Sequence, residues 1–290
     1  MKSAEVIDMV YAIEEQALSL NSNDYWHWYY QGKLLNDKKH YTEALAAYEK
    51  ALAARPHDYW SWYNRGKVLQ TLGRYSESLG SFESAIKFRP NDYWTWYNKG
   101  LLLLEDLDRY SEAIVCFDKA LSIRTEDYWC WFRKGDAFRH QEKYPEAAEC
   151  YDRALKLRND RDYWAWYRRG DALRYQKEYH SALYSYDRAL ELDSNSEWAW
   201  YKRGDVLRFL GNYSEALLSY EKAALLQTND DYAWYNQACC AAKLGKVEVA
   251  IDCLQKAIEL DSSNLEIARK DSDFELIRNK QQFQNLLSRT

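Results

Sequence analysis

The sequence contains little proline and glycine and no long apolar run. Its 290 residues include only 3 Pro and 10 Gly, a content that suits helices and excludes a collagen-like or low-complexity chain. No stretch approaches the roughly 18 consecutive apolar residues of a membrane-spanning helix. Four carboxylates are scattered through the first 20 positions, which is unlike a secretory signal. We therefore expect a helical, cytoplasmic protein with no membrane contact.

Motifs for catalysis, metal binding and cofactor binding are also missing. The five His residues do not have the HExxH spacing of a zinc site, and no GxGxxG or GxSxG motif occurs. The six Cys residues form no CxxC pair and fall in predicted helices, so we expect reduced thiols. We therefore expect no enzyme activity, no metal and no cofactor. The net charge of -5 lacks the basic excess of a typical nucleic-acid-binding protein.

The most prominent feature that is present is a repeated Trp-x-Trp block. It recurs every 34 or 35 residues, and a seventh copy, Tyr232/Trp234, keeps only the second Trp. Self-similarity at this period predicts a solenoid, in which each repeat is a small unit that packs on its neighbours. The six complete blocks are Trp26/Trp28, Trp60/Trp62, Trp94/Trp96, Trp129/Trp131, Trp164/Trp166 and Trp198/Trp200.

Each repeat is predicted to form two helices. With the second Trp as position 4, position 8 is Gly in six copies, position 20 is small, position 24 is aromatic in six copies and position 27 is always Ala. An Asp or Ser precedes every repeat and is a helix N-cap residue. Positions 20, 24 and 27 share one face of the second helix, where small residues allow close approach of the first. The repeats run 25–58, 59–92, 93–127, 128–162, 163–196, 197–230 and 231–264.

This pattern resembles the tetratricopeptide repeat (TPR) family, which has Trp at 4, Gly at 8, Ala at 20, an aromatic at 24, Ala at 27 and Pro at 32. The resemblance implies an all-α, right-handed superhelical solenoid of seven helix-turn-helix repeats over residues 25–264. We expect an N-terminal capping helix over residues 1–24 and a C-terminal capping helical segment over 265–290. The latter, with Phe274 and Phe283, is similar to the closing segment of many bacterial TPR proteins. Position 7 departs from the family, because it is polar in every copy.

The two Trp residues of a block point in different directions. A helix turns by about 100° per residue, so position 2 lies about 160° from position 4. Positions 4, 8 and 11 share the packing face, and positions 2, 5, 6, 9 and 12 lie opposite. We therefore expect the second Trp in the core. In the TPR family the face of position 2 lines the concave inner groove, and the resemblance implies the same here.

The candidate binding residues are the side chains predicted to face this groove. Two Arg or Lys residues accompany one Asp in repeats four to six, and guanidinium groups beside aromatic rings suit carboxylate recognition. Position 3 has diverged beside the fixed Trp, which argues against undecayed duplication as the reason for the Trp row. The candidates are Trp26, Trp60, Trp94, Trp129, Trp164, Trp198, Tyr29, Tyr63, Tyr97, Phe132, Tyr167, Tyr201, Asn64, Asn98, Arg133, Arg139, Arg168, Arg174, Lys202 and Arg208.

The leading hypothesis is a non-enzymatic scaffold that binds an acidic partner segment with apolar anchors in this groove. Asn64 and Asn98 match part of the family's carboxylate clamp, but Tyr or Phe replaces the clamp Lys at position 5, so that specificity is not carried over. Two alternatives stay open: single-stranded RNA stacked on the aromatic rows, and a purely structural or self-assembling solenoid. The oligomeric state, and occupation of the groove by the protein's own tail, also stay open.

Overall fold

A computed structural model describes residues 24–288, and these residues are helical with no strand. The predicted capping helix at 1–24 lies outside the described residues except for Asp24. None of the described helices combines the length and apolarity that a bilayer crossing requires. The first helices of the predicted repeats are α2 (Tyr25–Asp37), α4 (Tyr59–Thr71), α6 (Tyr93–Leu101), α8 (Tyr128–His140), α10 (Tyr163–Tyr175), α12 (Glu197–Phe209) and α14 (Asp231–Lys243). The second helices are α3 (Tyr41–Ala54), α5 (Tyr75–Phe88), α7 (Tyr110–Ile123), α9 (Tyr144–Leu157), α11 (Tyr179–Leu192), α13 (Tyr213–Leu226) and α15 (Val247–Leu260).

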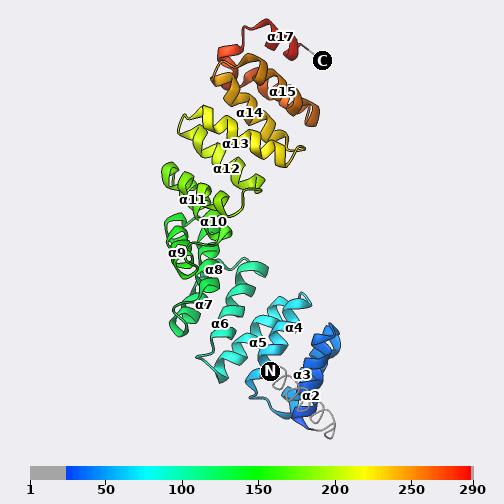
Figure 1. Cartoon of the computed structure of the whole chain (residues 1–290). Helices are drawn as coiled ribbons and strands as arrows, with labels where there is room; N and C mark the ends of the chain where they lie inside the picture. The colour runs from blue at the N-terminus through cyan, green and yellow to red at the C-terminus, as the bar shows by residue number, and fades with distance from the viewer. Residues whose placement is uncertain (1–23, 289–290) are drawn as a thin grey trace, which may run out of the picture. The chain divides into compact units, whose positions relative to one another are not determined.

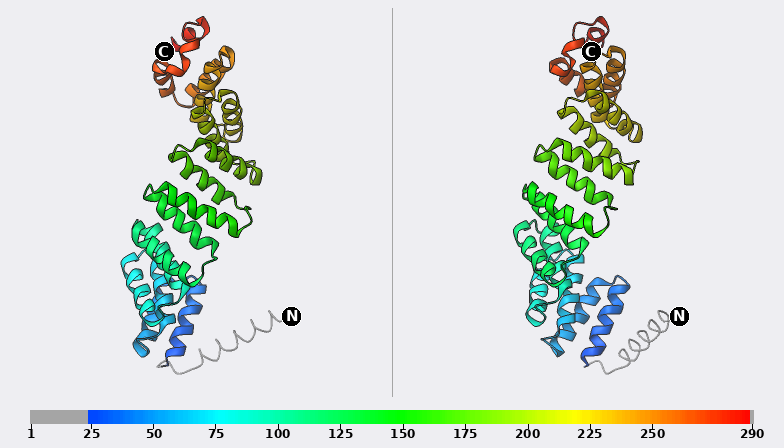
Figure 2. Two further views of the ribbon diagram at one scale, coloured as in Figure 1. Left: turned by 90° about the vertical axis from the view of Figure 1, so that its left-hand side faces the viewer. Right: turned by 60° about the vertical axis from the view of Figure 1, so that its left-hand side comes forward.

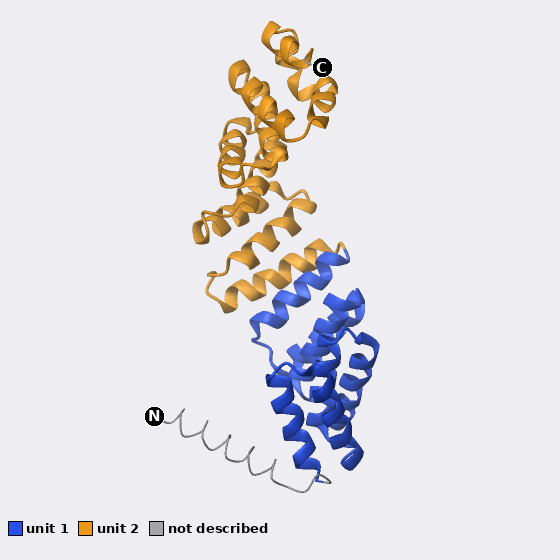
Figure 3. Cartoon of the chain, turned by 90° about the vertical axis from the view of Figure 1, so that its right-hand side faces the viewer, with its two compact units in different colours: residues 1–141 blue, residues 142–290 orange. Residues whose placement is uncertain are grey.

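The chain divides into two compact units, residues 1–141 and 142–290 (Figure 3). The division falls between α8 and α9, which the sequence places in one repeat. Within each unit, helices that follow one another in the chain pack side by side as helix-turn-helix pairs (Figures 1 and 2). The expected fold class, an all-α solenoid of helix-turn-helix repeats, is confirmed.

Local sequence signals set the ends of the helices. The side chain before each first helix accepts a first-turn backbone N–H, as when Asp58 accepts from Ser61 N at 2.7 Å. Each short turn between the two helices contains one residue with positive φ. Gly supplies it in three repeats, and residues such as Lys39 (φ 63°) and Lys177 (φ 64°) supply it in others. The N-cap residues predicted before the first helices are confirmed by their hydrogen bonds to first-turn N–H groups.

The extra residue of the third repeat is accommodated inside its first helix. After Leu101, α6 continues as a π-helical turn, η1 (Leu102–Asp106), in which the wider winding takes up one more residue per turn. The next helix begins at Tyr110 with the usual pattern, and Ala113 and Phe117 are fully buried. The insertion therefore leaves the contact between the two helices of this repeat unchanged.

The core of a helix pair is a contact between glycine and an aromatic ring. A Cβ atom added to Gly66 would lie 2.9 Å from Cε1 of Phe82, and the same close approach joins Gly204 to Tyr220. Phe82 and Tyr220 are fully buried. Only glycine at position 8 therefore lets the ring at position 24 lie flat against the first helix.

The second Trp of each block is less buried than expected. Trp166 is only 6% exposed, but the other position-4 Trp residues are half-buried. In repeats two to seven the indole N–H donates to a backbone carbonyl six residues earlier, for example Trp62 to Pro56 O at 2.8 Å. The buried positions are instead position 1 in repeats one to four, as in Tyr59, and position 3 in repeats two to seven. From repeat two onward, packing thus restricts position 3 to small residues, and its divergence is weaker evidence about the Trp row than the sequence suggested.

Cations at the polar position 7 connect neighbouring repeats. Arg169 donates to Asp152 of the preceding helix at 2.6 Å and to Ser185 of the following helix at 2.6 Å. Its guanidinium carbon also lies 5.5 Å from the ring centroid of Trp166. Equivalent bridges to the preceding helix join Arg65 to Glu49, Lys99 to Glu83, Lys134 to Asp118 and Arg203 to Asp187. The departure from the family at position 7 therefore supplies polar contacts between repeats.

The C-terminal segment packs against the last helix pair. It consists of α16 (Ser263–Lys270), the 3₁₀ helix η2 (Ser272–Ile277) and α17 (Gln281–Leu287). Phe274 and Phe283 stack with ring centroids 5.3 Å apart, and both are fully buried together with residues of α14 and α15. The two Phe residues that the sequence singled out thus cover the apolar end of unit 2.

We expect Gly66→Ala to lower the free energy of unfolding and Gly80→Ala to raise it. The new methyl group at position 66 meets the buried Phe82 ring, and overpacking of this kind costs about 1–3 kcal/mol, against about 1 kcal/mol gained in helix propensity. Gly80 lies on the exposed face of α5, and an added Cβ would have no neighbouring atom within 4 Å. Only the gain in helix propensity, up to about 1 kcal/mol, therefore applies. Urea titrations followed by circular dichroism measure both; equal shifts in the two variants would contradict the packing argument.

Candidate functional site

The first Trp of each block is exposed on the surface of its first helix. In unit 1 the exposed fraction rises from 41% at Trp26 to 50% at Trp94, and in unit 2 Trp164 and Trp198 are 56% and 57% exposed. Tyr232 takes the equivalent place on α14. Neighbouring first helices are linked by hydrogen bonds. For example, Asn98 Nδ2 donates to Tyr63 OH at 3.0 Å, and Asn236 Nδ2 donates to Tyr201 OH at 2.9 Å.

In unit 1 an arginine covers each of the first three exposed Trp rings. The guanidinium carbon of Arg55 lies 5.4 Å from the ring centroid of Trp26, and those of Arg89 and Arg124 lie 5.3 Å from Trp60 and Trp94. These arginines are the C-cap residues of the second helices. We did not single them out from the sequence, although Arg at position 31 recurs at the period of the repeat. They are cation–π partners supplied by the protein itself.

In repeats five and six the equivalent arginine is replaced. Asp193 and Gln227 occupy position 31 of repeats five and six. The rings of Trp164 and Trp198 are therefore the most exposed of the six, and the nearby cations come from the first helices themselves. Among the described residues, this stretch presents large aromatic surface without an intramolecular guanidinium stacked on it.

The aromatic residues at position 5 lie between helices. Phe132 and Tyr167 are only 7% and 8% exposed. In repeats one to five the ring stacks on the aromatic ring four residues earlier, as Tyr59 and Tyr63 do with centroids 6.0 Å apart. The ring also meets the position-24 ring, as Tyr63 meets Phe82 and Tyr201 meets Tyr220. Burial raises the pKa of Tyr63 and of Tyr97 to about 12. The candidates Tyr29, Tyr63, Tyr97, Phe132, Tyr167 and Tyr201 therefore support the exposed Trp row from beneath.

The Asp at position 9 is a buried hydrogen-bond acceptor. Asp171 is 8% exposed and accepts from Tyr186 OH at 2.8 Å, and Asp205 accepts from Tyr220 OH at 2.7 Å. Repeats two and three have Phe at position 24 and carry no Asp at position 9. Repeats four to six combine this Asp with Tyr, whereas repeat one has Tyr48 with Lys33 at position 9. The sequence therefore carried a partial signal for the Asp–Tyr pair, which we did not use.

The candidate cations have local partners. Arg133 lies 3.3 Å from Glu105 and 3.4 Å from Asp136, and Lys202 lies 3.8 Å from Asp205. Arg208 Nη1 donates to Asn236 Oδ1 at 2.6 Å. The guanidinium of Arg174 lies 4.4 Å from the ring centroid of Tyr175, and Arg139 contacts His140. Arg168 is half-buried on α10. These contacts hold the cations beside the aromatic row.

One group of potential metal ligands comes together near the C-terminus: Cys239, Asp271 and Asp273. The Cys239 thiol donates to Asp271 at 3.8 Å, and Tyr235 OH donates to the same carboxylate oxygen at 2.8 Å. Lys243 lies 3.1 Å from Asp273. Burial and the two carboxylates raise the pKa of the thiol far above its usual range, which favours the protonated form over the metal-binding thiolate. The group is accounted for by hydrogen bonds that hold η2 against α14.

Sequence and structure comparisons agree on the class of repeat. Models described as "Tetratricopeptide repeat" match residues 61–92, 95–127, 128–160, 198–230 and 232–264, and a model described as "TPR repeat" matches 32–73 and 170–208. No curated protein matches the chain at a significant level.

Several solved structures are similar. YrrB, described as a TPR protein with an unusual peptide-binding site, is 25% identical with a TM-score of 0.58, over 65% of this chain and 97% of that one. The C-terminal part of a TPR protein from Cytophaga hutchinsonii is 18% identical with a TM-score of 0.71, over 82% and 96%. A TPR protein from Parabacteroides merdae is 16% identical with a TM-score of 0.60, over 88% and 99%.

We expect Tyr220→Phe to destabilise the protein by about 1–3 kcal/mol, because it leaves the Asp205 carboxylate without its hydroxyl donor. Adding Asp205→Leu should recover part of this loss, since repeat three carries the Leu101/Phe117 combination at the same positions. A double-mutant cycle from urea unfolding measures the coupling. A coupling energy of zero would contradict the pairing.

We expect the protein to lose stability between about pH 10 and 12. Unfolded tyrosines ionise near pH 10, whereas the folded pKa of Tyr63 and of Tyr97 is raised to about 12 by burial. The stabilisation is thus complete below pH 10 and is lost as the pH rises through the folded pKa. Urea midpoints at increasing pH, with tyrosinate absorbance, measure the effect, and Tyr97→Phe should weaken it. Tyrosinate formation complete at pH 10 in the folded protein would rule the explanation out.

Proposed function

The chain belongs to the tetratricopeptide repeat family, and we propose from this that it is a non-enzymatic scaffold that binds a segment of a partner protein on the exposed face of its first helices. The proposal includes the division into a capping helix over 1–24, seven repeats over 25–264 and a closing segment over 265–290, in a cytoplasmic protein.

The observation that carries the proposal is the exposure of the first Trp in every complete block. A Trp that is 56% or 57% exposed, as Trp164 and Trp198 are, adds little to the core. Rows of exposed large apolar side chains mark interaction sites in soluble proteins. Trp and Arg are also the residues most enriched among those that dominate binding energy.

The centre of the site in this proposal is on α10 and α12. Here the Trp rings lack the arginine that covers Trp26, Trp60 and Trp94 in unit 1. Arg168, Lys202 and Arg208 lie on the same two helices. A partner segment would place apolar anchors on Trp164 and Trp198 and carboxylates near the cations. YrrB, which is described as having an unusual peptide-binding site, supports this by likeness.

Single-stranded RNA is the second candidate, because bases stack on exposed aromatic rings. The same cations would meet its phosphates. The net charge of -5 and the carboxylate partners of Arg133 and Lys202 favour the protein partner.

The experiment compares Trp164→Ala/Trp198→Ala with Trp26→Ala/Trp60→Ala as matched control, both shown to be folded by circular dichroism. Each immobilised protein is incubated with a lysate of the source cells, with and without nuclease, and the recovered proteins are identified. We expect a partner to bind the wild type and the control, and to bind the Trp164/Trp198 variant at least about tenfold more weakly.

The remaining outcomes contradict the proposal in different ways. Recovery that disappears with nuclease would assign the aromatic rows to RNA. Equal recovery by both variants, together with lowered stability, would assign them to the stiffness of the solenoid.

A further inference from the structure

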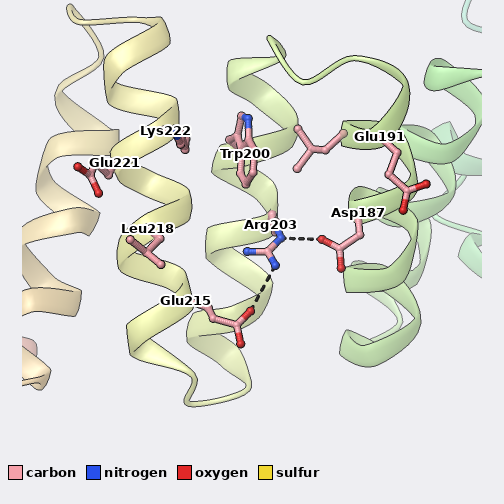
Figure 4. Close-up of a pocket in the computed structure, with 9 residues that line it drawn as sticks. Asp187, Glu191, Trp200, Arg203, Glu215, Leu218, Glu221 and Lys222 are labelled. Atoms are coloured by element: carbon pink, nitrogen blue, oxygen red, sulfur yellow. Dashed lines mark hydrogen bonds and ion pairs between the residues drawn. The ribbon is translucent and has the colours of Figure 1, made fainter.

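A second surface feature lies on the opposite side of α12 from Trp198. It is a pocket of about 670 Å³ between α11 and α13, and its floor is Trp200 (Figure 4). We call it the Trp200 slot. Its lining residues are Asp187, Leu190, Glu191, Trp200, Arg203, Glu215, Leu218, Glu221 and Lys222.

The polar groups at the floor of the slot are already satisfied. Trp200 donates its indole N–H to Ser194 O at 2.9 Å. Arg203 donates to Asp187 at 2.6 Å and also reaches Glu215 (Figure 4). A further hydrogen bond joins Arg203 to Ser219 at 2.7 Å. What the slot offers to a ligand is therefore apolar surface, from the Trp200 ring and from Leu218, whose side chain is 58% exposed.

The preceding repeat shows which kind of group fits this place. There Trp166 is the equivalent of Trp200, and Tyr184 packs edge-on against it with centroids 5.6 Å apart and an interplanar angle of 83°. The guanidinium carbon of Arg188 lies 5.8 Å from the same ring. Trp166 is consequently only 6% exposed. An aromatic ring with a cation beside it thus fills the space over this Trp.

Repeat six has the same framework with smaller side chains. Leu218 and Lys222 stand 34 residues after Tyr184 and Arg188, and neither covers the ring, because Trp200 stays half-buried. Edge-to-face aromatic pairing adds to the gain from area burial alone. A ring from outside would make over Trp200 the contact that Tyr184 makes over Trp166.

The charge of the lining residues favours particular residues next to the bound aromatic side chain of the partner. Four of the lining residues are carboxylates, and two are cations. Arg188, which pairs with Glu191, is the nearest further cation on α11. Because the rim carries excess negative charge, basic residues beside the aromatic one are favoured.

We propose that the Trp200 slot binds one aromatic side chain of a partner protein segment in which basic residues flank that side chain. This surface is separate from the exposed Trp164/Trp198 row, which lies on the other face of the first helices, so either site can fail without the other.

Three variants of the full chain test the slot. Leu218→Tyr copies repeat five and closes the slot from within, and Leu218→Ala is the matched control that leaves it open. Tyr184→Leu does the reverse and opens a second slot over Trp166. The probes are synthetic peptides with the core Lys-Tyr-Lys, Lys-Ala-Lys or Glu-Tyr-Glu. Binding is followed by the ¹⁵N–¹H NMR signals of the indole groups, with that of Trp200 assigned through Trp200→Phe.

We expect Lys-Tyr-Lys to shift the Trp200 signal in the wild type, where it binds about tenfold more tightly than Lys-Ala-Lys. In Leu218→Ala the same shift should appear at a higher peptide concentration, because the slot stays open but the apolar surface of Leu218 is lost. The shift should disappear in Leu218→Tyr, and a new shift at Trp166 should appear in Tyr184→Leu. Because one variant closes a slot and the other opens one, misfolding of either leaves the other decisive.

Three results would overturn the proposal. Equal binding of Lys-Tyr-Lys and Lys-Ala-Lys would show that the slot does not select an aromatic side chain. Equal binding of Lys-Tyr-Lys and Glu-Tyr-Glu would show that it does not select basic flanking residues. A Trp200 signal that moves with protein concentration alone, and no longer does so in Leu218→Tyr, would make a second copy of this chain the occupant.

Loss of partner binding in Trp164→Ala/Trp198→Ala with unchanged peptide shifts at Trp200 would show the two sites to be independent.

Discussion

The close contact between a glycine of the first helix and a buried aromatic ring of the second is the interaction on which the helix pairs depend, except in repeat seven, where Ala238 and Leu254 take these two places. Without a side chain at Gly66 or Gly204, the rings of Phe82 and Tyr220 lie against the helix backbone. This spacing brings the small residues at positions 20 and 27 into the same interface, where they are fully buried. The two helices are therefore held together mainly by the complementary shapes of these side chains, and the polar residues of the interface need only hydrogen-bond partners.

Once the pairs are fixed, neighbouring repeats meet through two layers. The inner layer consists of position-1 and position-5 tyrosines whose hydroxyl groups reach the next repeat: Tyr59 OH lies 3.0 Å from Thr95 Oγ1, and Tyr63 OH accepts from Asn98 Nδ2 at 3.0 Å. The outer layer is ionic, with bridges such as Arg169 to Asp152. Because both layers are satisfied within the protein, the first Trp of each block is left with its ring on the surface. Exposure of that Trp is a consequence of the packing, and it makes the first helices a surface suited to binding.

Small differences between repeats then decide what each exposed ring offers. An arginine at position 31 covers Trp94, whereas Asp193 at that position leaves Trp164 open. Tyr184 closes the space over Trp166, whereas Leu218 leaves Trp200 accessible. Repeats that share one framework can in this way carry different surfaces on both sides of the same helix.

The repeat, the helix pairs and their N-caps could be predicted from the sequence alone, as could the different faces of the first and second Trp of each block. These features depend on local chemistry and on the angle between residues along one helix. The depth of each side chain depends on the packing of the folded chain and could not be predicted: examples are the half-burial of Trp200, the burial of Asp171 and the position of Arg124 over Trp94. The physical reason is that burial is set by side chains of neighbouring helices, and in this chain the decisive neighbour is often one residue in another helix, such as Tyr184 or Leu218.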